Sequence, residues 1–228
     1  MYLLIFLATL AISLLASARV KSLYRRYSQV SASSRASGAQ VAAAILQRAG
    51  IHDVEIVAAD GLLGDHYDPL HKRLVLSMEN YQSDSLAAIG VAAHECGHAL
   101  QHQQGYAPLH LRMAAVGIAQ FANRIVMFLP FLFLFSASLI HTGFALMAAA
   151  WGVIMLFNLV TLPVEFDASN RAKRVLAEMG FVGNEEEMTG VRKVLDAAGW
   201  TYVAAFVSSL AYMLYYLLPL LLGGRSRN

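Results

Sequence analysis

Long apolar runs alternate with polar segments along this chain, and the runs are long enough to predict membrane-spanning helices. Residues 125–164 contain no Asp, Glu, Lys or Arg, and neither do residues 197–224 and 1–18. A bilayer-spanning helix needs about 20 apolar residues. The first run therefore predicts two spans with a polar turn at His141–Gly143 between them, and each of the other runs predicts one span.

Shorter patterns in the remaining sequence predict a small α+β part. Residues 52–59 and 73–77 alternate polar and apolar positions as β-strands do. The periodicity of apolar positions and the residues at its ends predict helices at 39–50, 84–104 and 183–198.

These patterns together predict a mainly α-helical membrane protein with about four transmembrane helices and a small cytoplasmic α+β domain. Its transmembrane helices are expected at 1–18, 123–142, 143–164 and 201–223, its cytoplasmic parts at 19–122 and 165–200, and a tail at 224–228.

Composition agrees with a membrane protein and narrows the chemistry. The chain is 57% hydrophobic and 14% charged, with a mean hydropathy of +0.52, outside the usual balance of a soluble domain. A net charge of +2 gives no support for nucleic-acid binding, and none is expected. The single cysteine, Cys96, excludes an intrachain disulfide.

Basic residues orient the predicted spans. Of the 17 Lys and Arg residues, ten lie from Arg19 to Arg124 and five from Arg171 to Lys193. With four spans these two segments share a side, which the positive-inside rule assigns to the cytoplasm. Residues 1–18 could instead be a cleaved signal peptide, but their basic residues follow the apolar run, so a retained anchor is expected.

The sequence VAAHECGHALQH, residues 91–102, contains the spacing of a zinc site. His94 and His98 are four residues apart and share one helix face, so both imidazoles can bind one metal ion. Glu95 is placed to accept a proton from water at that metal, as in the H-E-x-x-H pattern of zinc peptidases. Small neighbours such as Gly97 let the helix pack closely under a site.

A catalytic zinc ion needs a third protein ligand. Cys96 points to nearly the opposite helix face, and His102 lies a further turn from the metal, so neither is expected to bind it. Glu165 is the first charged residue after the 125–164 run, and two predicted crossings separate it from His98. An even number of crossings puts both on one side of the membrane, so Glu165 is the expected third ligand.

Four segments resemble the YugP-type family of neutral zinc metallopeptidases of bacterial membranes: VAAHECGHALQH, DHYDP (65–69), LVLS (74–77) and LPVEFDASNRA (162–172). The resemblance implies a zincin-like domain with one zinc ion per chain on His94, His98 and Glu165, and Glu95 as general base. It also implies a multi-pass protein of the bacterial inner (plasma) membrane, and the placement of basic residues puts the expected active site on the cytoplasmic face.

The site is similar to those of gluzincins such as HtpX and the CAAX prenyl proteases. In those relatives an Asp commonly lies four residues after the ligand Glu and orients a zinc-binding His. Here Ser169 occupies that position and Asp167 lies nearby, so either could be the orienting residue.

The expected reaction is hydrolysis of a peptide bond in a protein or peptide substrate by zinc-activated water. His66, Tyr67 and Arg171 are candidates to stabilise the developing oxyanion. The strand at 73–77 could bind substrate by adding it as an extended strand. The lipid bilayer and unidentified accessory membrane proteins are the other expected partners.

Three alternatives remain. An intramembrane protease of the site-two type also carries H-E-x-G-H, and Asn158 and Pro163 resemble its N-x-x-P segment, but its L-D-G ligand motif is absent. A scaffold or chaperone-like membrane protein could hold zinc structurally, although such a site has no use for Glu95. A transporter is disfavoured, because His141 is the only ionisable candidate deep in the later spans.

Overall fold

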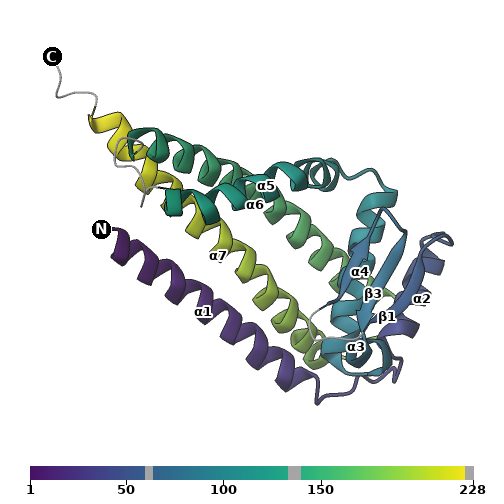
Figure 1. Ribbon diagram of the computed structural model, residues 1–228. Coiled ribbons are helices and arrows are strands. Elements are labelled where there is room, and N and C mark those ends of the chain that lie inside the picture. The colour runs from purple at the N-terminus through teal and green to yellow at the C-terminus, as the bar shows by residue number, and fades with distance from the viewer. Residues whose placement is uncertain (60–63, 133–139, 224–228) are drawn as a thin grey trace. The chain divides into compact units, whose positions relative to one another are not determined.

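The computed structural model describes residues 1–59, 64–132 and 140–223, and these form a mainly helical chain with one small sheet (Figure 1). The chain divides into two compact units, described separately here: the first is Met1–Leu15, Leu111–Leu162 and the chain from Thr201, and the second is Ala16–His110 and Pro163–Trp200. The elements in chain order are α1 (Tyr2–Tyr27), α2 (Gly38–Arg48), β1 (Glu55–Ala59), β2 (His66–Asp68), β3 (Arg73–Ser77), α3 (Met78–Gln82), α4 (Leu86–Gln103), α5 (Ala107–Leu132), α6 (Ile140–Glu178) and α7 (Glu185–Gly223).

Among the described residues, four helices are long and apolar enough to cross a membrane: α1, α5, α6 and α7. Large apolar side chains of the first unit, such as Phe121, Phe128 and Leu156, are exposed. A helix satisfies its own backbone hydrogen bonds, so such a surface can face hydrocarbon without cost. The expectation of four apolar helices of spanning length is confirmed.

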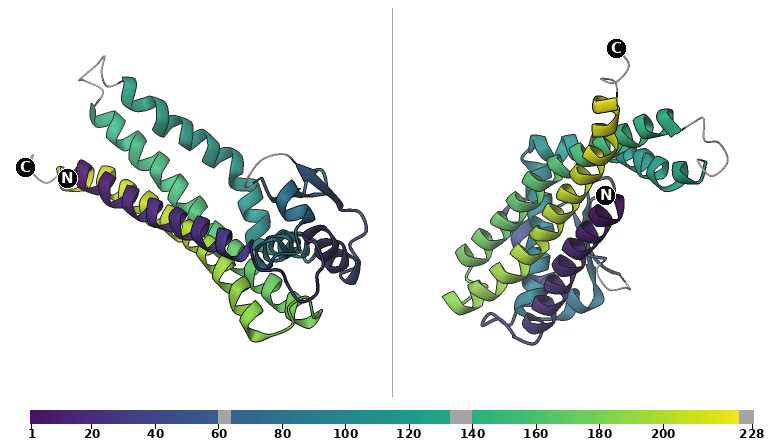
Figure 2. Two further views of the ribbon diagram at one scale, coloured as in Figure 1. Left: turned by 90° about the horizontal axis from the view of Figure 1, so that it is seen from below. Right: turned by 90° about the vertical axis from the view of Figure 1, so that its left-hand side faces the viewer.

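Polar side chains within the first unit find partners on neighbouring helices. α1 and α7 run side by side (Figure 2), where the hydroxyls of Thr9 and Tyr212 lie 3.2 Å apart. The Trp151 ring of α6 stacks on Tyr212 with centroids 4.5 Å apart. Asn158 Nδ2 donates to Ser209 Oγ over 3.1 Å. The hydrogen bonds of Thr9 and Asn158 satisfy groups that would otherwise be costly in an apolar surrounding. Trp151 Nε1 and Ser208 Oγ, by contrast, are buried without a hydrogen-bond partner among the described residues.

The helices differ in their bounds from the predicted membrane spans. α6 begins at Ile140, so His141–Gly143 lie in its first turn and do not form the expected loop. Polar and small residues are tolerated in the first turn of a helix, where the first four backbone N–H groups have no intrahelical acceptor. α5 begins at Ala107, well before the expected 123, and α7 joins the expected 183–198 helix to the last span. The His141 side chain and the tail at 224–228 lie outside the described residues.

The second unit contains a three-stranded sheet in the order β1-β3-β2. β1 pairs with β3 in parallel, with Glu55 opposite Arg73, and β2 pairs with β3 antiparallel, with His66 opposite Val75. β3 is therefore the central strand. The expectation that residues 73–77 could take up a substrate strand was wrong, because both sides of β3 are already paired.

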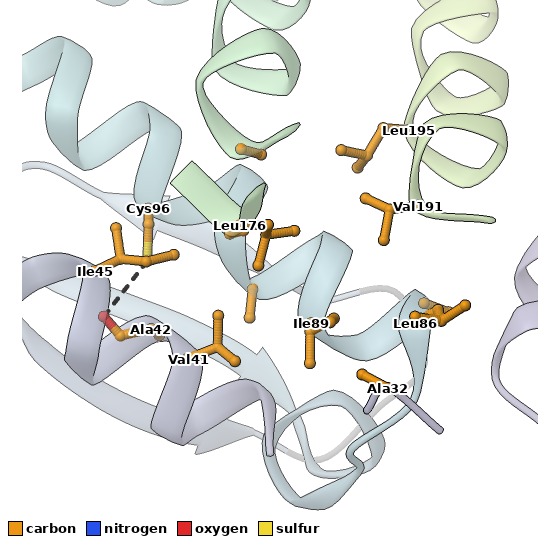
Figure 3. Close-up of a cluster of buried hydrophobic side chains, with 14 of the residues drawn as sticks. Ala32, Val41, Ala42, Ile45, Leu86, Ile89, Cys96, Leu176, Val191 and Leu195 are labelled. Atoms are coloured by element: carbon orange, nitrogen blue, oxygen red, sulfur yellow. Dashed lines mark hydrogen bonds between the residues drawn. The ribbon is translucent and has the colours of Figure 1, made fainter. Parts of the chain in front are cut away.

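A hydrophobic core joins α2 and α4 to parts of α6 and α7 in this second unit (Figure 3). Ile45 of α2 and Ile89 of α4 pack with Leu176 of α6 and Val191 of α7, and all four are at most 1% exposed. The Ser85 side chain caps the N-terminus of α4 by accepting from Ala88 N. This core fixes α4 against the last turns of α6.

Candidate metal centre

α4 presents two imidazoles from one of its faces. His94 and His98 lie one helical turn apart, with ring centroids 4.8 Å apart and planes at 85°. Their side chains are 15% and 10% exposed. The spacing of four residues and the cap at Ser85 are the local causes of this arrangement, and the sequence predicted it.

α6 brings a carboxylate to the same point. Glu165 Oε2 lies 3.2 Å from His94 Nε2 and 3.7 Å from His98 Nε2. Two ligands of a tetrahedral zinc ion, each about 2.0–2.1 Å from the metal, are about 3.3 Å apart. These three side chains therefore have the donor types and the spacing that zinc requires. Glu165 is only 2% exposed, which suits a charged ligand far better than a solvated residue at a helix end.

A glycine allows the two helices to meet. A Cβ atom built on Gly97 would lie 2.6 Å from the carbonyl oxygen of Ala168 and 3.0 Å from its Cα. Any side chain at position 97 would therefore push α6 away from α4. Since Ala168 lies one turn after Glu165, this contact sets how close Glu165 comes to the imidazoles.

The other ring nitrogens of both histidines have partners. His94 Nδ1 lies 3.1 Å from Ser169 Oγ, and His98 Nδ1 lies 3.0 Å from Gln101 Oε1. Metal-binding histidines usually make such a second contact, which orients the ring. Of the two orienting residues expected from the sequence, only Ser169 contacts a histidine, namely His94. Asp167 instead accepts a hydrogen bond from Gln101 and forms an ion pair with Arg171.

Negative charge dominates the electrostatics of this centre. Burial lowers the pKa of His98, but contact with Glu165 and the charge of Glu95 outweigh it, and the net pKa lies above the ordinary value. Glu95 is 8% exposed and adjacent to His94. The centre is thus suited to a cation, and Glu95 provides a further carboxylate beside it.

The three oxyanion candidates have other partners. His66 Nδ1 lies 2.6 Å from the Gly64 carbonyl, and the Tyr67 hydroxyl lies 2.9 Å from His102 Nδ1. Arg171 pairs with Asp167, donates to the side chain of Gln104 and lies over the Tyr106 ring. None of these contacts points to one candidate over the others.

Cys96 belongs to the core. Its thiol is fully buried and points to the Ala42 carbonyl, with sulfur and oxygen 3.7 Å apart (Figure 3). The expectation that it packs in the interior is confirmed. Gln101 was not among the site residues predicted from the sequence. Its one signal was its position three residues after His98, on the same side of the helix.

The sequence matches the protein family described as "putative neutral zinc metallopeptidase" over residues 2–221. It is 43% identical over 230 residues to a protein of Bacillus subtilis (strain 168) named "Putative membrane protease YugP", and the match covers the full length of both chains. No solved structure matches the chain. Geometry and comparison agree, and the chain belongs to the family described as putative neutral zinc metallopeptidases.

Proposed function

We propose that this chain is a membrane zinc endopeptidase that binds one zinc ion through His94, His98 and Glu165. The observation that carries the proposal is the convergence of one nitrogen from each imidazole and one buried carboxylate oxygen, all within 4.8 Å of one another. When bound, zinc would supply a Lewis acid that polarises the scissile carbonyl and makes water a stronger nucleophile.

Glu95 has the role of general base in this proposal. It follows His94 on α4 and its charge acts on His98, so its carboxylate lies beside the metal ligands without being one of them. There it can take a proton from the attacking water and pass it to the leaving amine. A purely structural metal site gains nothing from such a carboxylate, which favours an enzyme over a zinc-stabilised scaffold.

The site is proposed to face the cytoplasm from the bacterial plasma membrane. The basic residues of 19–124 and 171–193 support this orientation through the positive-inside rule. Protein or peptide chains reachable from that side are the proposed substrates. An intramembrane protease is disfavoured, because α4 is not among the four described helices apolar enough to span, and it packs on α2 and the small sheet.

The test measures zinc content and casein cleavage for the purified full chain and two variants. Glu95→Gln should retain zinc and lose about 10²–10⁴-fold in cleavage rate. Glu165→Ala should lose zinc as well as cleavage. Glu178→Ala, an exposed carboxylate on the same helix that pairs with Arg48, is the matched control and should retain both.

Two results would count against the proposal. Full zinc content in Glu165→Ala would remove Glu165 from the ligand set. Undiminished cleavage by Glu95→Gln would remove the general base and with it the proposed mechanism.

A further inference from the structure

Gln101 is a fully buried amide that joins the candidate metal centre to α6. It lies on α4 one turn after His98 and is 0% exposed. Its Nε2 atom donates to the Val164 carbonyl and to Asp167 Oδ2, each over 2.8 Å. Its Oε1 atom lies 3.0 Å from His98 Nδ1. Every polar group of this amide is therefore engaged.

The surroundings allow only one orientation of the amide. A backbone carbonyl and a carboxylate can only accept hydrogen bonds, so the NH₂ group must face Val164 and Asp167. Arg171 pairs with Asp167 and holds that carboxylate in place. The carbonyl oxygen of Gln101 must then face His98.

This orientation determines which nitrogen of His98 carries the proton. An amide oxygen accepts but does not donate, so a contact at 3.0 Å requires a hydrogen on His98 Nδ1. In the neutral ring, Nε2 then keeps its lone pair. His94 differs, because its Nδ1 faces the Ser169 hydroxyl, which can donate or accept.

We propose that Gln101 is a positioning residue that locks the neutral His98 ring in the Nδ1–H tautomer and so presents Nε2 to the metal before the metal arrives. The inference rests on the proposed function, because it assumes that His98 Nε2 is a zinc ligand. It goes further because it gives the two histidines unequal roles. A fixed acceptor sets the tautomer of His98, whereas the Ser169 hydroxyl is compatible with either tautomer of His94.

The first experiment compares zinc affinity in two variants that each lose a buried amide, measured on the full chain by competition with a chelator. Gln101→Leu should weaken zinc binding by about 10- to 100-fold. Asn80→Leu is the matched control: Asn80 is 2% exposed and bonded to Tyr24 and Asp65, away from the ligands. It should lower the melting temperature comparably and leave zinc affinity unchanged.

A second variant tests the direction of the hydrogen bonds. Combining Gln101→Glu with Asp167→Asn keeps an acceptor toward His98 and reverses the donor and acceptor between positions 101 and 167, while the Val164 carbonyl loses its donor. Zinc affinity should rise above that of Gln101→Leu, because the ring again meets a fixed acceptor, and stay below that of wild type, because the Val164 carbonyl is left unpaired.

A measurement on the wild-type protein does not depend on how any variant folds. Nitrogen NMR of the metal-free chain, labelled at histidine and held above the titration range of imidazole, should show His98 with its proton on Nδ1. A proton on Nε2 of His98 would overturn the inference. So would equal zinc affinity in wild type and Gln101→Leu, or an equal loss in Asn80→Leu. A wild-type chain that bound no zinc would overturn the proposed function, and this inference with it.

Discussion

Gly97 of α4 and Ala168 of α6 meet backbone to backbone, at a distance that leaves no room for a Cβ atom between them. Each lies three residues from a candidate ligand, Gly97 from His94 and Ala168 from Glu165. The two halves of the metal centre come from segments far apart in the sequence, and this contact holds them in register.

Replacing Gly97 by Ala should therefore impair the centre without touching a ligand. The added methyl group would displace α6, since overpacking of a tight contact costs about 1–3 kcal/mol. We expect at least a tenfold loss of zinc affinity and a lower melting temperature. Gly117→Ala is the control, because a Cβ there meets nothing within 4 Å. Normal zinc binding by Gly97→Ala would show that the contact does not position Glu165.

Ser169→Asp should strengthen zinc binding. Ser169 Oγ lies 3.1 Å from His94 Nδ1, and a carboxylate there would be a stronger acceptor and would raise the basicity of the ring. We expect a gain of up to about tenfold in zinc affinity, measured by chelator competition. Ser169→Ala should weaken binding instead. The same affinity in all three proteins would mean that the hydroxyl does not act on the metal centre.

Removal of zinc should make stability depend on pH through His98. Its pKa is raised in the folded chain, so protonated His98 stabilises the metal-free fold below about pH 6.5, the unfolded value. That contribution is lost as the pH rises through the raised value. With EDTA present, the melting temperature should fall over this window, whereas added zinc should raise it most at the alkaline end.

Glu165→Gln is the control for this pH dependence, because it removes a carboxylate that raises the pKa of His98. The fall in melting temperature should then occur at lower pH. A fall at the same pH in both proteins would show that a group other than His98 causes the pH dependence.

Site-directed labelling tests the proposed orientation. In intact cells, a membrane-impermeant thiol reagent should label Thr142→Cys, at the exposed start of α6, from outside. Gln47→Cys, exposed on α2, should be labelled only after the membrane is permeabilised. Labelling of Gln47→Cys from outside in intact cells would contradict a site that faces the cytoplasm.

Local signals in the sequence were sufficient for α4 and the two longer strands. The helix expected at 84–104 is found at Leu86–Gln103, because Ser85 caps its start and Gly105, with a φ of 64°, ends it. The strands expected at 52–59 and 73–77 are found as β1 and β3. Which strand is central depends on pairing between distant residues, and alternation alone does not encode it.

The ends of the long helices were harder to predict. Hydropathy marks where a helix is apolar, but α6 and α7 continue beyond those stretches through polar residues to Glu178 and back to Glu185. Glu165 was predicted as a ligand from its place after the 125–164 run and from membrane crossings, and the family resemblance implied the same role. The contacts of Gln101 could not be predicted, because they require knowing that Val164 and Asp167 lie against α4.

The interior position of Cys96 has a practical consequence for chemical labelling. Burial and the neighbouring charge of Glu95 raise the pKa of its thiol, so almost no reactive thiolate is present at neutral pH. The native chain, whose only cysteine this is, should be nearly silent toward maleimides and mild oxidants. Reporter cysteines can therefore be introduced singly into the wild-type sequence, with the original thiol left in place.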